Sequence, residues 1–257
     1  MDTRTASRQK VRGGAQTSAT DLPDAHWSRF LGVPQAALQE AGVLITAHAK
    51  LGSNRGVGFF VRENSAVVSA PSEWVGPLEH ALALVAAHQL LSPEFVGRLL
   101  GGAAPRVIGP SYQGWLPPDR FVRTPSDGVR RLDDTQLGLA EGVRASCSTE
   151  EEHGGIELAG REVWAAFHGS RIVAPGQLRA QAIGAADPCV VTHTAYRANG
   201  YARRVMSTIV ETALSAGPLV LYQTPLSNGP AVSLAHRLGF EQYATLLAVR
   251  LASHSGE

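Results

Sequence analysis

One strand-to-helix junction constrains the fold of this chain of 257 residues more than any other segment. An apolar run from Asp187 to His193 is typical of a strand, and an amphipathic helix is predicted soon afterwards, from Gly200 to Ala216. Gly217 then marks the end of that helix. A strand that leads through a short loop into a helix indicates a fold of the α/β or α+β class, in which helices pack on a sheet.

The segments around this junction predict further elements of the same kind. A helix from Asp133 to Cys147 precedes two strand-like runs, Glu162 to Phe167 and Arg171 to Ile183, which a tight turn connects. The run PLVLYQT predicts a buried strand, Asn228 caps a helix, and FEQYATLLAVRL predicts a long last strand. With the short run VRRLDD at its start, this part has the order β-α-β-β-β-α-β-α-β.

The first part of the chain predicts an α+β unit of its own. Helical pieces begin at Asp24 and Pro34, and apolar spacing predicts a helix from Trp74 to Leu91. Ser92 caps the next helix. Strands are expected over 43–51, 57–64 and 65–71, and over the closing run RVIGPSYQGWLP.

Prolines divide the chain into two halves. Pro117, Pro118 and Pro125 disfavour a helix or a central strand in the segment that joins them. We therefore expect a flexible tail over 1–22, an N-terminal α+β half over 23–118 and a second domain over 129–257. The tail is basic and polar, without the apolar stretch of a secretory signal.

Composition argues against several classes of protein. The formal net charge of +1 gives no electrostatic reason to expect nucleic acid or an anionic membrane as a partner. No stretch approaches the ~20 apolar residues of a membrane span. Cys147 and Cys189 lie far apart without metal-ligand spacing and are interpreted as free thiols. A cytoplasmic protein without a metal site is expected.

The loop of the junction carries the chemistry that the sequence predicts. The first amides of a helix have no partner within the helix, and the helix dipole makes that end attractive to anions. Gly200 lets the backbone approach a ligand closely, and Arg197 and Arg203 can neutralise charge. These residues predict a phosphate or pyrophosphate site, although an ordinary strand–loop–helix turn has the same pattern.

Two motifs resemble those of the GNAT acyltransferases. The run from Arg197 to Ala202 is similar to the R/Q-x-x-G-x-G/A signature of that superfamily. The run NGPAVSLAHRLGF, from Asn228 to Phe240, is similar to its second motif and lies at the usual distance downstream. The resemblance covers about residues 129–251 and implies a mixed, mostly antiparallel sheet flanked by helices.

The resemblance implies acetyl-CoA as donor and a direct attack of an amine on the thioester, without a covalent enzyme intermediate. The strand that ends near Thr194 would present its backbone to the pantetheine arm, and the loop after it would wrap the pyrophosphate. The implied donor-binding residues are Thr192, His193, Thr194, Arg197, Ala198, Asn199, Gly200, Tyr201, Ala202 and Asn228.

The sequence departs from the family pattern where the proton donor is expected. Many members carry a tyrosine at the position of Ala235, where it protonates the leaving sulfur. His236 is the next residue, but one step along a helix turns a side chain by about 100°. Ala202 also replaces the second glycine of the loop, which the looser family pattern tolerates.

Four other residues are candidates for catalysis or for acceptor binding. His193 lies on the strand beside the acyl site and suits proton transfer near neutrality, although alternation could turn it away. Glu152 and His153, in an acidic run beside two glycines, could hold an amine or take its proton, or could be a solvated surface. Tyr222 could contact the substrate or pack in the core.

The leading hypothesis is an N-acetyltransferase that acts on a small-molecule amine, as a monomer or homodimer. The alternative is a non-catalytic acyl-CoA-binding or regulatory module, which the missing tyrosine favours. Transfer of a longer acyl group or of an aminoacyl group is a third possibility. The first half could be a degenerate second copy of the same fold or an unrelated α+β cap, and in either case we expect it to contribute walls to the acceptor pocket.

Overall fold

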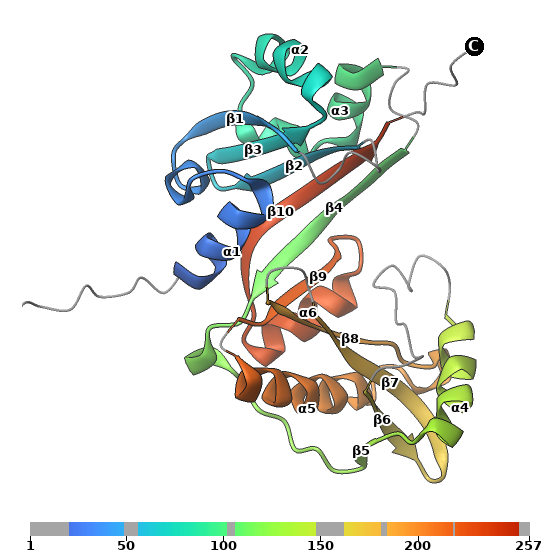
Figure 1. Ribbon diagram of the computed structural model, residues 1–257. Helices are drawn as coiled ribbons and strands as arrows, with labels where there is room; N and C mark the ends of the chain where they lie inside the picture. Colours follow the sequence, from blue (N-terminus) through green and yellow to red (C-terminus); the bar gives the residue numbers. More distant parts are fainter. Residues whose placement is uncertain are drawn as a thin grey trace, which may run out of the picture.

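The computed structural model describes residues 21–48, 56–101, 106–147, 162–180, 184–217 and 219–251 (Figure 1). Its strands form a sheet of six, in the order β1-β3-β2-β10-β4-β9, and a sheet of four, in the order β5-β6-β7-β8. All strand ladders are antiparallel except the one between β1 and β3. The expected class, a mixed and mostly antiparallel sheet flanked by helices, is confirmed. No helix in these ranges is both long and apolar enough to span a membrane.

The elements follow the chain in two series. The first comprises α1 (Asp21–Leu31), β1 (Gly42–Ala47), β2 (Gly56–Arg62), β3 (Ser65–Ala70), α2 (Ser72–Leu82), α3 (Pro93–Leu100) and β4 (Arg106–Trp115). The second comprises β5 (Val129–Arg131), α4 (Asp134–Ala145), β6 (Val163–His168), β7 (Arg171–Ala180), β8 (Ala186–Val190), α5 (Tyr201–Ala216), β9 (Leu221–Pro225), α6 (Gly229–Leu238) and β10 (Glu241–Arg250). The predicted order of the second series is confirmed.

The helix predicted from Trp74 to Leu91 is wrong as one continuous element. It ends at Leu82, and a separate 3-10 helix follows over Ala87–Leu91. Between the two, Leu84 is fully exposed but Val85 still packs on the core, so the apolar spacing continues past the end of the helix. The interruption redirects the chain and lets Leu90 pack in the core against β2 and β10.

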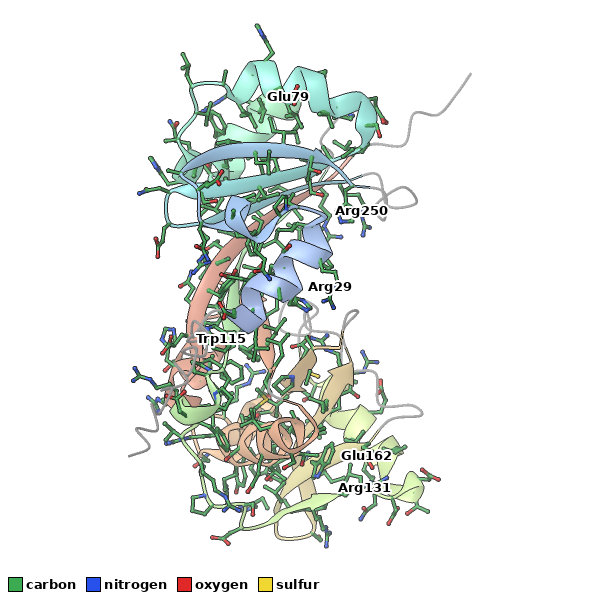
Figure 2. The ribbon with its side chains drawn as sticks, turned by 60° about the vertical axis from the view of Figure 1, so that its left-hand side comes forward. Arg29, Glu79, Trp115, Arg131, Glu162 and Arg250 are labelled. Carbon is green, nitrogen blue, oxygen red and sulfur yellow. The ribbon has the colours of Figure 1, made fainter. Side chains whose placement is uncertain are left out.

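The last strand does not stay with its own half of the chain. β10 lies between β2 and β4, pairing Leu246 with Phe60 on one side and with Ser111 on the other. β4 in turn pairs with β9, so one sheet contains strands from both halves (Figure 1). Trp115, at the end of β4, lies between the two parts of the molecule in Figure 2. It belongs to a buried cluster that includes Trp27 of α1 and Leu221 of β9.

Helices cover both faces of the four-stranded sheet. Val143 of α4 packs with Ile172 and Cys189 on one face. Val205 and Ile209 of α5 pack against the other. Only a short segment with the 3-10 helix Thr194–Tyr196 joins β8 to α5, so this packing fixes the start of the helix near the end of the strand.

A buried charged group fastens α1 to the shared sheet. The carboxylate of Asp24 accepts hydrogen bonds from Arg62 of β2 at 2.9 Å, from Gln39 at 2.6 Å and from the hydroxyl of Tyr243 of β10. The side chain of Asp24 is only 3% exposed and that of Arg62 is 18% exposed. Burial and the bond to Asp24 raise the pKa of Tyr243, so its hydroxyl stays protonated and donates.

We expect Asp24→Ala to lower the free energy of unfolding by about 3 kcal/mol, because it leaves the Arg62 guanidinium without its buried partner. Denaturant unfolding measures the loss. The control is Arg131→Ala, which removes the exposed ion pair with Glu162 shown in Figure 2 and should cost less than about 1 kcal/mol. Equal losses for the two variants would contradict the importance of the Asp24 group.

Candidate functional site

Among the described residues, a single backbone bridge joins two neighbouring strands that then separate. β8 and β9 run parallel and share one bridge, between Ala186 and Val220, with the Ala186 amide donating to the Leu219 carbonyl at 3.1 Å. Beyond that point β8 pairs with β7, and β9 pairs with β4. The two strands therefore diverge towards their carboxyl ends, and Figure 1 shows this divergence.

The chain after β8 keeps an extended backbone. The regular strand ends at Val190, three residues earlier than predicted, but the amides of Val191 and His193 still donate to carbonyls of β7 at 3.0 and 2.9 Å. Because backbone groups alternate along an extended chain, the amide of Thr192 faces the diverging side. The side-chain oxygen of Thr192 is buried without a hydrogen-bond partner. A ligand bound here could supply that partner.

The loop from Arg197 to Gly200 has an unusual backbone. Ala198 and Gly200 both have positive φ, at 61° and 76°. Left-handed alanine is uncommon and costs energy, so surrounding contacts must hold it. The side chain of Asn199 supplies two of them, donating to the carbonyls of Tyr196 at 3.3 Å and Arg197 at 2.9 Å.

Helix α5 begins immediately after this loop, and its first amides are available. No side chain caps its N-terminus, and the first helical bond runs from the Arg204 amide to the Gly200 carbonyl. The amides of Tyr201, Ala202 and Arg203 therefore point out of the helix end without helical partners. A loop with two left-handed residues and three amides without helical partners together suit phosphate oxygens.

A second helix begins across the divergence. Asn228 caps α6, where its Oδ1 accepts the amide of Ala231 at 3.2 Å. Since the oxygen is used in the cap, the side chain can offer only its NH₂ group to a ligand. The positive ends of α5 and α6 both follow the carboxyl ends of the two diverging strands.

The side chains of Arg197 and His193 both form hydrogen bonds with the backbone of their own segment. The Nε of Arg197 donates to the Thr192 carbonyl at 3.2 Å and its guanidinium lies 3.9 Å from the sulfur of Cys147. His193 caps a short 3-10 helix, because its Nδ1 accepts the amide of Ala195 at 3.2 Å. Both side chains therefore support the loop, and a catalytic role of His193 stays a prediction.

Three further predicted residues remain, and the structure describes one of them, Tyr222. Glu152 and His153 lie outside the described residues. Tyr222 is 7% exposed and packs against Phe240, and burial raises the pKa of its hydroxyl. Its contact with a substrate stays a prediction. The described ranges contain no group of three metal-ligating side chains.

Sequence reasoning missed Tyr112. This tyrosine comes from β4 in the first half, yet it lies in the same buried cluster as Ala235, Val190 and Tyr222. Its hydroxyl is buried without a hydrogen-bond partner, and burial, followed by the carboxylate of Glu241, raises its pKa. No motif marks it, because the pairing of β4 with β9 brings it there from a distant part of the chain.

No family model and no curated relative matches the sequence. A GCN5-related N-acetyltransferase from Kribbella flavida has a similar structure over 94% of this chain and 98% of its own, with a TM-score of 0.50 and 14% identity. The chain has the GNAT fold.

Two further structures resemble parts of this GNAT fold. A protein described as a GNAT-family acetyltransferase from Novosphingobium aromaticivorans matches 59% of this chain and 67% of its own, with a TM-score of 0.49 and 20% identity. An acetyltransferase from Salmonella typhimurium, solved with acetyl-CoA, matches 50% of this chain and 96% of its own, with a TM-score of 0.39 and 13% identity.

The close packing of α5 on β7 depends on Gly176. A Cβ there would lie 2.7 Å from the Cys189 carbonyl oxygen and 2.8 Å from a methyl of Val205. We expect Gly176→Ala to lower the free energy of unfolding by about 1–3 kcal/mol, because backbone and helix must move apart. Thermal or denaturant unfolding measures this change.

The matched control is Gly142→Ala in α4. A Cβ at this helical glycine meets nothing within 4 Å, so the variant should gain up to about 1 kcal/mol from helix propensity. If Gly176→Ala were as stable as the native chain, the contact between β7 and α5 would be looser than described.

Proposed function

We propose that this protein is an acyltransferase that moves the acetyl group of acetyl-CoA to the amine of a small molecule. The observation that carries the proposal is the loop from Arg197 to Gly200. It joins two left-handed residues to the uncapped start of α5, beside strands that diverge. The free amides of such a loop and helix start can donate to pyrophosphate oxygens. The open edge of a strand can form hydrogen bonds with the pantetheine arm.

The residues present fit this donor. The amides of Tyr201, Ala202 and Arg203 would bind the pyrophosphate, and the amide of Thr192 would bind the pantetheine arm. The buried oxygen of Thr192 would gain the partner that it lacks. The NH₂ group of Asn228 would face the same arm from the start of α6. Acetyl-CoA, when bound, supplies an activated thioester carbonyl.

The proposed reaction joins the amine nitrogen to the carbonyl carbon and breaks the carbon–sulfur bond. The amine releases a proton and the leaving thiolate takes one, so the protein must orient both reactants and handle both protons. We keep Glu152 as the candidate for receiving the proton of the amine, because Nδ1 of His193 already accepts the Ala195 amide and its neutral ring has no other free lone pair. Tyr112 is the candidate for the donor to sulfur, because its hydroxyl is protonated and lies in the buried cluster that contains Ala235.

Isothermal titration of the full chain with acetyl-CoA and with CoA tests the proposal. Binding at micromolar concentrations is expected, and its absence at millimolar concentrations would lead us to abandon an acyl-CoA site. Release of free thiol in the presence of a panel of amines then separates an enzyme from the alternative, a non-catalytic acyl-CoA-binding module. That alternative is favoured by Ala235, which offers no hydroxyl.

We expect Ala202→Asp to weaken CoA binding about tenfold or more, because a carboxylate among the loop amides repels the pyrophosphate. The same change should leave folding unharmed, since a negative charge in the first turn of α5 suits the helix dipole. Titration and thermal unfolding measure the two effects. Leu84→Asp, at a fully exposed position of the first half, is the control of equal charge.

We expect Tyr112→Phe to reduce turnover at least tenfold while CoA affinity stays unchanged. It should also leave stability unchanged or raise it, because it removes a buried hydroxyl that has no partner. Free-thiol release, titration and unfolding give the three readouts. The control is Ser69→Ala, which removes another buried hydroxyl without a partner, in β3. Full activity of Tyr112→Phe would remove Tyr112 as a proton donor.

A further inference from the structure

A group of aromatic and basic side chains lies beside the proposed phosphate loop. The turn between β6 and β7 contributes His168 and Arg171, and the loop itself contributes His193, Tyr196 and Tyr201. Nδ1 of His168 lies 2.9 Å from the Tyr201 hydroxyl. The guanidinium of Arg171 lies over the ring of Tyr196, 5.6 Å from its centre. These five side chains, with Arg204, are called the turn cluster below.

The turn cluster is positively charged and accessible. Arg204 donates to the Asp127 carbonyl at 3.1 Å, and its guanidinium lies 4.7 Å from the centre of the Tyr201 ring. Among the described residues no carboxylate forms an ion pair with Arg171 or Arg204. His168 and Arg171 are exposed, and the other members are partly exposed. The cluster therefore offers two guanidinium groups and several ring surfaces to a ligand.

The contact between Arg171 and His193 shows what kind of ligand is needed. Nδ1 of His193 accepts the fixed amide proton of Ala195, so the neutral ring carries its own hydrogen on Nε2. The guanidinium of Arg171 lies 3.2 Å from that Nε2. Two donors thus face each other with no acceptor between them. An oxyanion that accepts from both would satisfy both, and phosphate has the oxygens to do so.

The position of the cluster identifies which phosphate this would be. The phosphate loop has the diverging strands on one side and the turn of β6 and β7 on the other. If the pantetheine arm leaves the pyrophosphate towards the divergence, the adenosine end leaves towards the turn. That end of coenzyme A carries an adenine ring and a dianionic phosphate on its ribose. Guanidinium groups and aromatic rings bind both kinds of group well.

We propose that the turn cluster binds the adenine and the 3′-phosphate of coenzyme A, so that the protein selects donors that carry this phosphate. Arg171 and His193 hold the phosphate oxygens, with Arg204 adding positive charge. The rings of Tyr196, Tyr201 and His168 pack against the adenine. This inference rests on the proposed function, because it concerns the other end of the same donor.

The test compares coenzyme A with dephospho-coenzyme A by titration. The native chain should bind coenzyme A at least about tenfold more tightly, the value of one charge-assisted contact. Arg171→Ala should lower the affinity for coenzyme A to that for the dephospho form, and should leave the affinity for the dephospho form unchanged. Arg171→Lys should keep part of the difference, because it keeps the charge.

Two probes and a control complete the experiment. Adenosine 3′,5′-bisphosphate should compete with coenzyme A for the native chain and lose affinity in Arg171→Ala. Phosphopantetheine, which lacks the adenosine end, should bind both proteins equally. Arg106→Ala removes one exposed charge in the first half and should change none of these affinities. Thermal unfolding of each variant confirms that it is folded.

The outcomes separate this inference from the proposed function. Equal affinity of the native chain for coenzyme A and its dephospho form would overturn the turn-cluster site and leave the acyltransferase proposal standing. If Arg171→Ala lowered the affinity for both ligands equally, the turn-cluster site would also be overturned and the acyltransferase proposal would stand. If coenzyme A does not bind at all, both proposals fail.

Discussion

The pairing of β10 with β2 and β4 is the constraint on which the rest of the structure depends. The last strand of the chain completes the sheet that the first half begins. β4 is thereby held beside β9, on the edge of β9 that is opposite to β8. Because each of these contacts joins residues far apart in sequence, the two halves must assemble together, and Asp24 and Trp115 pack at their boundary.

The divergence of β8 and β9 follows from this arrangement. β9 pairs with β4, and β8 pairs with β7. Among the described residues, the one backbone bridge between β8 and β9 therefore joins Ala186 and Val220. Helices α5 and α6 start at the separated ends and pack on one shared core. An open strand edge with two helix ends beside it is thus a consequence of the topology, and the proposed donor site occupies this place.

The sequence predicted the local features well. The strand before His193, the loop at Gly200 and the helix after it depend on propensities and spacing that act within a few residues. The GNAT fold follows from such elements in the right order. The pairing of β10 with β2 and β4 could not be predicted, because the pattern of a strand shows which face is buried and does not show which strands pair with it. Tyr112 was missed for the same reason. The break after Leu82 was missed because the apolar spacing continues to Val85, which still packs on the core although the helix has ended.

The same distinction separates donor binding from catalysis. The loop from Arg197 to Gly200 uses backbone amides and backbone conformation, which one short segment specifies by itself, and such a segment remains recognisable when the rest of the sequence changes. Proton transfer uses side-chain groups that need only reach the right point in space, from whichever element the fold supplies. Ala235 removes the group that α6 could have offered, and the shared sheet places the hydroxyl of Tyr112 in the same cluster. A motif can therefore predict how a donor would be held, while the group that we propose as proton donor comes from an element outside the motif.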